Sequence, residues 1–309
     1  MKKVKPFVKW VGGKRQLLEQ LERYYPDELK KGTINCYIEP FLGGGAVCFS
    51  ILEKYKIKNV YLSDKNSDLI LTYNVIQKKH DILLEFLEQY QKLYDETILE
   101  KRYDLFRTIR KHFNEQRFEI NYKRLSENWI PRAAQFIFLN RTCFNGLFRL
   151  NSKLEFNVPF GKYKTAKIYD LDNIKAVSSA LQNAEIIQAE YFSCYEKAND
   201  NTFIYLDPPY RPIKQTSSFT TYTGTEWTDK QQIELASFFQ KLDKEKRAKL
   251  MLSNSDPTNI NTNDTFFERT YYGYNFFKIF ANRNINCNGA GRGKINELII
   301  TNYRGNNET

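Results

Sequence analysis

The segment Asp207-Pro208-Pro209-Tyr210 restricts the fold and the chemistry of this chain more than any other part of its sequence. It follows the run from Thr202 to Leu206, whose β-branched and aromatic residues predict a buried strand. Open α/β sheets bind ligands beyond the carboxyl ends of their strands, and this tetrapeptide would lie at such an end. Its two prolines fix the backbone and remove two N–H donors, so the segment is stiff and rich in acceptors.

The side chains of the tetrapeptide suit a planar amino group that is attached to an aromatic ring. The Asp207 carboxylate and the Pro208 carbonyl can both accept from such an amine, and Tyr210 can stack on the ring. The exocyclic amine of adenine has this chemistry. The alternative is an ordinary turn at the end of a strand, because Asp and Pro are common in turns. We favour a catalytic role for Asp207, Pro208, Pro209 and Tyr210.

Composition limits the class of protein. The 309 residues allow one large α/β domain with an insert, or two domains. A net charge of +11 with 15% aromatic residues favours a polyanionic partner with stackable bases, although charge alone fits any basic protein equally well. The five cysteines are scattered without C-x-x-C spacing, which argues against a disulfide framework or a zinc site, and we expect no metal. His80 and His112 are expected at the surface.

The sequence shows no targeting or membrane signal. No apolar signal core follows the N-terminal residues, and no apolar run approaches the length that spans a membrane. We therefore expect a cytoplasmic protein that has no membrane partner.

Strand and helix signals alternate in two separated parts of the chain. Strands are predicted at 34–38, 59–62, 185–188, 202–206, 249–253 and 297–301, and helices at 46–55, 171–182 and 229–242. Residues 67 to about 123 instead show apolar residues at helical spacing. Residues 144–163 are expected to form a long hairpin or loop. The predicted organisation is a catalytic domain at 1–66 and 166–309, divided by an insert at 67–165.

A glycine-rich turn follows the first predicted strand. Its sequence, E-P-F-L-G-G-G from Glu39 to Gly45, lets the backbone turn tightly and approach a ligand. It is not a complete G-x-G-x-x-G motif, because Cys48 occupies the third glycine position, and a simple turn is the alternative. Asp64 ends the next predicted strand, where an acid accepts from ribose hydroxyls. Together these residues predict a nucleoside-type cofactor.

A third block lies near the N-terminus. The sequence F-V-K-W-V-G-G-K from Phe7 to Lys14 places an aromatic ring and a cation beside a flexible Gly-Gly pair. It is not a P-loop, because Val8 replaces the leading glycine and Arg15 replaces the Ser or Thr.

These blocks occur together with a fourth, which includes N-R at Asn140, F-N-G-L at Phe144 and F-N-V-P-F-G-K-Y from Phe156 to Tyr163. In this combination and order the chain resembles the Dam-like family of adenine-N6 DNA methyltransferases, including the DpnII-type modification enzymes, from about Lys5 to Tyr303. The resemblance implies an α/β fold: a Rossmann-like S-adenosylmethionine-dependent methyltransferase sheet with an inserted, mostly helical DNA-recognition domain that carries a β-hairpin.

The resemblance also implies site residues. S-adenosyl-L-methionine is the implied cofactor, and the implied cofactor contacts are Trp10, Lys14, Glu39, Phe41, Gly43, Gly45, Asp64, Glu190 and Asp207. The implied DNA contacts are Lys9, Phe144, Asn145, Leu147, Arg149, Asn151, Asn157, Pro159, Lys162, Tyr163 and Lys164.

The implied DNA contacts differ in their roles. Lys9 and Arg149 match residues that read guanines in GATC, and cations suit the guanine acceptors of the major groove. Leu147 and Pro159 match apolar contacts to other bases. Phe144 matches an aromatic wedge, which offsets the cost of unstacking a flipped base. For Phe144, Leu147 and Phe148 the alternative is packing in the core.

The implied function is transfer of a methyl group to N6 of a flipped-out adenine in duplex DNA, with GATC as the expected site. The implied partners are double-stranded DNA and a cognate restriction endonuclease, and we expect a monomer. Three alternatives stay open: a methyltransferase acting on an RNA base or a protein glutamine, a nucleotide-binding oxidoreductase, and a non-catalytic DNA-binding protein. Residues 217–222 form either a segment that closes over the flipped base or an ordinary loop.

Overall fold

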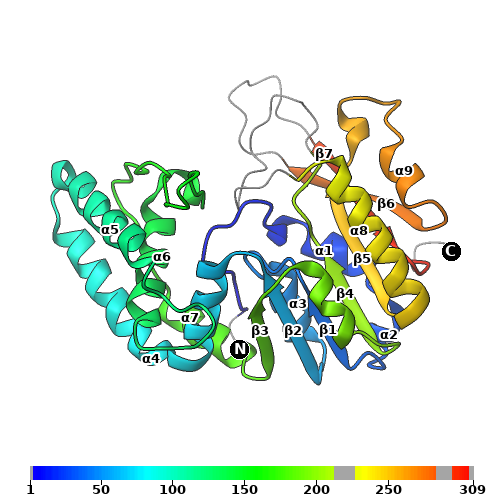
Figure 1. Cartoon of the computed structure of the whole chain (residues 1–309), viewed down its shortest axis with the longest axis horizontal. Helices are drawn as coiled ribbons and strands as arrows, with labels where there is room; N and C mark the ends of the chain where they lie inside the picture. The colour runs from blue at the N-terminus through cyan, green and yellow to red at the C-terminus, as the bar shows by residue number, and fades with distance from the viewer. Residues whose placement is uncertain (1–2, 212–226, 283–293, 306–309) are drawn as a thin grey trace.

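The computed structural model describes residues 3–211, 227–282 and 294–305 (Figure 1). The predicted closing segment at 217–222 lies outside these residues. The described strands form one seven-stranded sheet of order β3-β2-β1-β4-β5-β7-β6. The strands are β1 (Cys36–Glu39), β2 (Asn59–Asp64), β3 (Ala184–Gln188), β4 (Thr202–Leu206), β5 (Lys249–Ser255), β6 (Asn275–Asn282) and β7 (Lys294–Thr301).

The sheet is parallel from β3 to β5, and β7 runs antiparallel to both of its neighbours. The first strand, β1, pairs with β2 on one side and with β4 on the other, with Ile38 opposite Tyr61 and Ile204. The strand order therefore reverses between β1 and β4, and the crevice outside such a reversal is where open α/β sheets bind ligands. The antiparallel β7 between β5 and β6 distinguishes this sheet from the dinucleotide-binding order 3-2-1-4-5-6.

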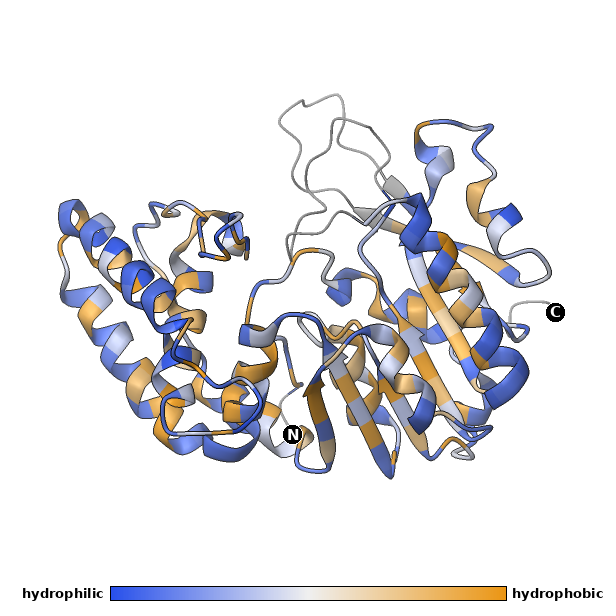
Figure 2. Ribbon diagram, viewed as in Figure 1, coloured by the Kyte–Doolittle hydropathy of each residue, from blue (hydrophilic) through white to orange (hydrophobic). Residues whose placement is uncertain are grey.

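Helices cover both faces of the sheet, and Figure 2 shows the apolar strands between them. Successive side chains of a strand point to opposite faces. Tyr37, Phe203 and Tyr205 accordingly join one buried cluster, while Ile38 and Ile204 join the other. The helices of the first face are α1 (Leu18–Arg23), α3 (Ala46–Lys54) and α7 (Leu171–Ala180), and those of the second are α8 (Asp229–Lys241) and α9 (Phe266–Thr270). The four-residue α2 (Asp27–Lys30) precedes β1.

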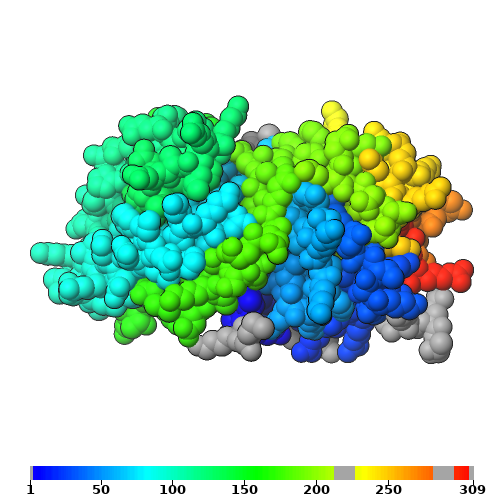
Figure 3. Space-filling model, turned by 90° about the horizontal axis from the view of Figure 1, so that it is seen from below, coloured from blue at the N-terminus to red at the C-terminus, as the bar shows by residue number. Residues whose placement is uncertain are grey.

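Three longer helices lie together beside the β3 edge of the sheet (Figure 1). They are α4 (Ser67–Glu96), α5 (Arg102–Gln116) and α6 (Trp129–Thr142). The prediction of helix for residues 67–123 is confirmed for α4 and α5, whereas α6 was not predicted. Figure 3 shows the green segment that leads through α7 to β3 lying between these helices and the first strands. The helix α4 also has non-helical backbone angles at Lys79, where it bends away from the sheet.

The predicted hairpin at residues 144–163 is less regular than expected. It contains a 3-10 turn at Phe144–Gly146 and two isolated antiparallel bridges, Cys143 with Phe160 and Leu150 with Phe156. Continuous strands do not form, because some backbone groups bond to side chains instead. The Phe156 amide, for example, donates to Asn114 Oδ1 at 2.8 Å. We call residues 143–164 the recognition segment.

Among the residues that the structure describes, no helix is both long enough and apolar enough to cross a membrane.

Candidate active site

Asp207 lies immediately beyond β4, at the point where the strand order reverses. Its Oδ2 atom accepts from Lys14 Nζ at 2.7 Å, and its Oδ1 atom accepts from Ser253 Oγ at 2.9 Å. Burial raises the pKa of Asp207, and the Lys14 cation and the Ser253 hydroxyl oppose that rise. The carboxylate is thus held in one orientation, with 19% of its side chain still exposed. Two hydrogen bonds leave lone pairs on both oxygens for a further donor.

Lys14 links the N-terminal block to this carboxylate. Its side chain is buried, and Nζ also donates to the Gly12 carbonyl at 2.6 Å. The same ammonium lies 4.8 Å from the centre of the Tyr210 ring, within the range of a cation–π interaction. The three residues Lys14, Asp207 and Tyr210 therefore form one contact group, although nearly two hundred residues separate Lys14 from the other two.

The backbone around the tetrapeptide is fixed by polar side chains that the sequence analysis did not identify. Gln232 donates to the Pro209 carbonyl at 3.0 Å, and Asn254 accepts from the Arg211 amide at 3.2 Å. No donor among the described residues bonds the Pro208 carbonyl. That carbonyl is therefore free to accept from a ligand next to Asp207.

Glu39 lies beneath the glycine turn at the end of β1. It is only 3% exposed, and it accepts from the Tyr37 hydroxyl at 2.5 Å and from the Cys48 amide. Burial raises the pKa of Glu39 to about 8. At neutral pH this carboxyl group is therefore largely protonated, and it can donate a hydrogen bond as well as accept one.

The glycine turn has no room for side chains. Gly43 and Gly45 have φ angles of 48° and 71°, which other residues rarely adopt. A Cβ atom on Gly43 would lie 2.8 Å from the Trp10 ring, and one on Gly45 would lie 2.6 Å from the Tyr73 hydroxyl. Trp10 thus rests directly on the turn, and its other neighbours include Phe148, whose ring centre is 6.1 Å away.

Asp64 ties the glycine turn to the end of β2. Its carboxylate accepts from the Gly43 amide and from the Asn66 amide, both at 2.9 Å. Burial raises the pKa of Asp64, and the backbone amides oppose the rise. Each oxygen keeps a lone pair, which suits the hydroxyl groups of a ribose.

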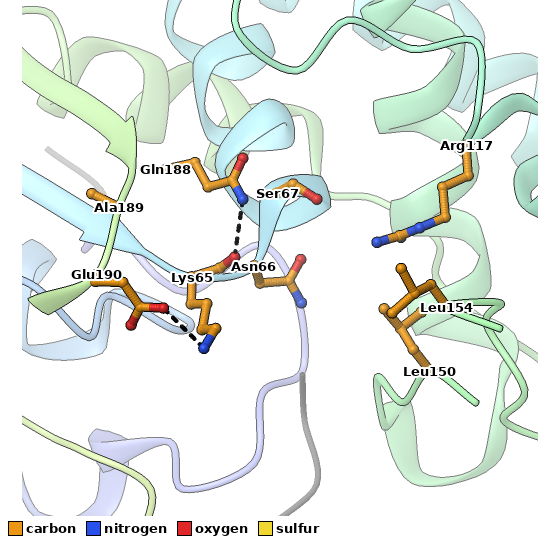
Figure 4. Close-up of a pocket in the computed structure, with 9 residues that line it drawn as sticks. All are labelled: Lys65, Asn66, Ser67, Arg117, Leu150, Leu154, Gln188, Ala189 and Glu190. Carbon is orange, nitrogen blue, oxygen red and sulfur yellow. Dashed lines mark hydrogen bonds and ion pairs between the residues drawn. The ribbon is translucent and has the colours of Figure 1, made fainter. Parts of the chain in front are cut away.

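A cavity of about 310 Å³ opens beside the ends of β2 and β3 (Figure 4). On one side Lys65 and Glu190 form an ion pair at 2.9 Å, and on the other Arg117, Leu150 and Leu154 face them from the insert. Asp207 and Tyr210 do not line this cavity.

The predicted cofactor residue Phe41 lies in an aromatic cluster next to Glu190. Its ring stacks on Tyr191 with centres 5.5 Å apart and meets Trp227 edge-on at 5.7 Å. Of the predicted cofactor contacts, Glu190 therefore lies at the cavity and Phe41 beside it. The other predicted cofactor contacts lie around the ends of β1, β2 and β4; they are Trp10, Lys14, Glu39, Gly43, Gly45, Asp64 and Asp207.

Lys9 is brought to the recognition segment by Asn140 of α6. The Asn140 side chain accepts from the Lys9 amide at 2.8 Å and donates to the Gly146 carbonyl at 2.8 Å. The Lys9 ammonium lies 4.9 Å from the centre of the Tyr163 ring, and the Tyr163 hydroxyl accepts from the Asn145 amide at 3.1 Å. Three of the predicted DNA contacts thus share one place in the fold.

The remaining predicted DNA contacts differ in exposure. Phe144 is 50% exposed, whereas its neighbour Phe148 is buried, so packing in the core accounts for Phe148 and not for Phe144. Leu147 is half-buried against the core. Arg149 is exposed, and its Nε atom donates to Asn157 Oδ1 at 2.8 Å. The exposed residues also include Pro159, Lys162 and Lys164.

Asn151 is used within the recognition segment itself. Its amide group donates to Glu155 at 2.8 Å and accepts from the amides of Lys153 and Glu155. These bonds shape the turn between the two bridges, so Asn151 has little capacity left for another partner.

Two further polar residues complete the site. Ser253 bonds Asp207, and Glu297 of β7 accepts from the Tyr210 hydroxyl at 2.6 Å. The signal that could have identified both is a polar residue inside an otherwise apolar strand next to β4 or β5. In the described parts of the chain, no group of three or more His, Cys, Asp or Glu side chains could hold a metal ion.

Comparison with known proteins identifies the family. Residues 10–285 match the model of the D12 class of N6 adenine-specific DNA methyltransferases. The chain is 46% identical over 301 residues to the Type II methyltransferase M.MjaIII of Methanocaldococcus jannaschii, covering 97% of this chain and 99% of that protein. It is 33% identical to the DNA adenine methylases of Vibrio cholerae and of Escherichia coli K12, covering 97% of this chain and 96% and 95% of those proteins.

These matches confirm the resemblance to the adenine methyltransferases that the sequence motifs indicated. They rule out two of the alternative functions, a nucleotide-binding oxidoreductase and a non-catalytic DNA-binding protein. The chain belongs to the D12 class of N6 adenine-specific DNA methyltransferases.

Proposed function

We propose that this enzyme transfers a methyl group from S-adenosyl-L-methionine to N6 of an adenine that is flipped out of duplex DNA, within the sequence GATC. The observation that carries the proposal is the pair of acceptors at the end of β4. The Asp207 carboxylate is held by Lys14 and Ser253, and the Pro208 carbonyl beside it has no donor among the described residues. An exocyclic amine has two hydrogens for these two acceptors.

The residues at the ends of β1 and β2 fit S-adenosyl-L-methionine. Asp64 has free lone pairs for ribose hydroxyls at the glycine turn, whose Gly43 amide it already accepts from. The Asp207 carboxylate suits a cationic ligand, because among the described residues Lys14 is the one cation in contact with it. When bound, S-adenosyl-L-methionine would supply an electrophilic methyl group. Trp10 and Phe41 would line its site, and Glu190 would lie at its nucleoside end.

The protein's own contribution at the adenine is placement and polarisation. Asp207 and the Pro208 carbonyl accept from N6 and so direct its lone pair away from them. The Lys14 ion pair favours the ionised form of Asp207, which makes this carboxylate a hydrogen-bond acceptor rather than a strong base. Tyr210 stacks on the adenine ring. A duplex must release its base into such a site, because N6 is inaccessible inside the stack.

The recognition segment supplies the proposed DNA contacts. Arg149 is exposed and oriented by Asn157, so its remaining guanidinium donors can reach guanine O6 and N7 in the major groove. Lys9 stands next to Tyr163 and serves a second guanine. Phe144 is the exposed aromatic group that would enter the space left by the flipped base. The exposed Lys162 and Lys164 suit phosphates.

Two partners belong to the proposal. Duplex DNA is the substrate, and we propose that the enzyme acts on it as a monomer. A cognate restriction endonuclease is supported by relatives named Type II methyltransferases, from Methanocaldococcus jannaschii and from Lactococcus lactis, the latter 35% identical over 97% of this chain.

The test is transfer of labelled methyl groups from S-adenosyl-L-methionine to matched duplexes with and without GATC, followed by identification of the modified nucleoside. N6-methyladenine confined to GATC supports the whole proposal. Methylation of another adenine site retains the chemistry and refutes the guanine assignments. Transfer only to RNA or to a protein refutes the proposed substrate. The Asp207→Ala variant is the control that any transfer depends on this site.

A further inference from the structure

Glu297 and Tyr210 form a contact that the proposed chemistry does not yet use. The Tyr210 hydroxyl donates to Glu297 Oε2 at 2.6 Å. Glu297 belongs to β7, where its register partners are Ser255 of β5 and Ile279 of β6. A phenol that donates to a carboxylate makes a short, strong hydrogen bond, because the acceptor carries a charge.

The contact fixes the free end of a side chain that is already fixed at its base. Gln232 and Asn254 hold the backbone on either side of Tyr210 through Pro209 and Arg211. The Lys14 ammonium lies against the ring. The hydroxyl bond to Glu297 is the one hydrogen bond of the Tyr210 side chain among the described residues, so together with the Lys14 contact it sets the tilt of the ring.

Glu297 has no second role in the described structure. Its side chain takes part in no other hydrogen bond and in no ion pair among the described residues. Burial raises the pKa of Glu297, while Lys14 and the Tyr210 hydroxyl oppose that rise. A partly buried carboxyl group is costly to keep, and in this strand an apolar residue would be the ordinary choice. The free-energy cost of burying this carboxyl group is explained if its function is to accept the hydrogen bond from the Tyr210 hydroxyl.

We propose that Glu297 is a positioning residue for methyl transfer: it holds the Tyr210 ring at the angle at which the target adenine stacks. This inference rests on the proposed stacking of adenine on Tyr210. A ring that is already oriented loses less freedom when the base arrives, which favours the reactive arrangement over other bound arrangements. The effect should therefore appear in kcat more than in the KM for DNA.

The test is a double-mutant cycle that separates the hydrogen bond from the ring. Tyr210→Phe keeps the ring and removes the donor, and Glu297→Leu removes the acceptor. Each should lower kcat about tenfold, and the double variant should also lose about tenfold rather than a hundredfold, because both changes break the same bond. Glu297→Gln keeps an acceptor oxygen and should stay within about threefold of the wild type.

A second readout excludes a merely structural role. Duplexes with 2-aminopurine at the target position report whether the extruded base stacks, since its fluorescence is quenched by an adjacent ring. Tyr210→Phe and Glu297→Leu should leave the base extruded but less quenched than in the wild type. The matched control is the exposed pair of Tyr195 and Glu245, which has the same bond far from the site. Tyr195→Phe and Glu245→Leu should change neither kcat nor the fluorescence.

The outcomes distinguish this inference from the proposed function. If the wild type methylates adenine but the two losses multiply to a hundredfold, the positioning role is refuted and the proposed function stands. The same holds if Glu297→Leu lowers the melting temperature and leaves kcat unchanged. If the wild type neither methylates adenine in duplex DNA nor changes the 2-aminopurine signal, the proposed function itself fails.

Discussion

Asp68, at the start of α4, is the acceptor of a buried ionic network that ties α4 to the rest of the insert. Its Oδ1 atom accepts from Arg132 Nε at 2.7 Å and from the Tyr122 hydroxyl at 2.8 Å, and Oδ2 accepts from Arg117 at 3.0 Å. Arg132 is fully buried, and it donates to the Phe113 carbonyl as well. The substitution Asp68→Asn keeps the shape of the side chain and removes its charge. The Arg132 cation then stays buried without a counter-charge.

The expected cost follows from this geometry. Breaking a buried ion pair by removing one partner costs about 3 to 5 kcal/mol, because an uncompensated charge remains in the interior. Urea unfolding followed by circular dichroism would measure the loss. The control is Glu115→Gln, which removes an exposed α5 pair with Lys111 at 3.8 Å and should cost about 0.3 to 0.5 kcal/mol. A loss below about 1 kcal/mol for Asp68→Asn, with an unchanged denaturant slope, would refute the reasoning.

Three further predictions concern the site. Asp207→Ala should lower methyl transfer at least about a hundredfold while the protein stays folded; substantial residual transfer in the labelled-methyl assay would remove its proposed role. Arg149→Ala should weaken discrimination at one guanine about tenfold to a hundredfold, measured on duplexes with single substitutions in GATC; an unchanged preference would contradict the assignment. Glu39 has its pKa raised to about 8 in the folded chain from an ordinary value of 4.5. Its contribution to stability is thus complete below about pH 4.5 and is lost as the pH rises through 8. Between about pH 4.5 and pH 8, the Tm of Glu39→Gln should fall less than the Tm of the wild type. If the two plots of Tm against pH run parallel, the pKa of Glu39 is not raised and the prediction fails.

The parts of the fold that the sequence could predict are those in which one physical signal dominates. The run from Thr202 to Leu206 is buried on both faces, so its β-branched and aromatic residues read clearly as a strand. The glycine turn could likewise be predicted from the sequence, because Gly43 and Gly45 adopt backbone angles that few other residues tolerate. In both cases the local sequence contains the whole cause of the local structure.

The parts that the sequence did not predict depend on partners far along the chain. Almost every residue of α6 is buried, so its sequence lacks the alternation of apolar and polar faces that marks a helix. Glu297 is a single acid in a strand, and its meaning depends on Tyr210, which lies 87 residues earlier. Lys14 contacts Asp207 across 193 residues, whereas the family resemblance implied only that both residues contact the cofactor. No local pattern encodes such contacts.

The insert and the catalytic sheet are joined too closely to act as independent units. The helix α4 starts three residues after Asp64, and before its bend at Lys79 it bonds the backbone of β3 through Asn74. Beyond the bend, the same helix packs against α6 within the hydrophobic core that the insert shares with the sheet. The domain boundary at residue 66 stays a prediction, because no break in packing marks it.

One route connects the recognition segment with Asp207. It starts at Asn140, whose side chain bonds both the Gly146 carbonyl and the Lys9 amide, and it follows the N-terminal block to Lys14, which holds the Asp207 carboxylate. The N-terminal block is thus tied to the recognition segment at one end and to the acceptors at β4 at the other, which favours a fixed relation between a bound base and those acceptors. We therefore expect specificity and catalysis to be impaired together when the bonds of Asn140 are removed.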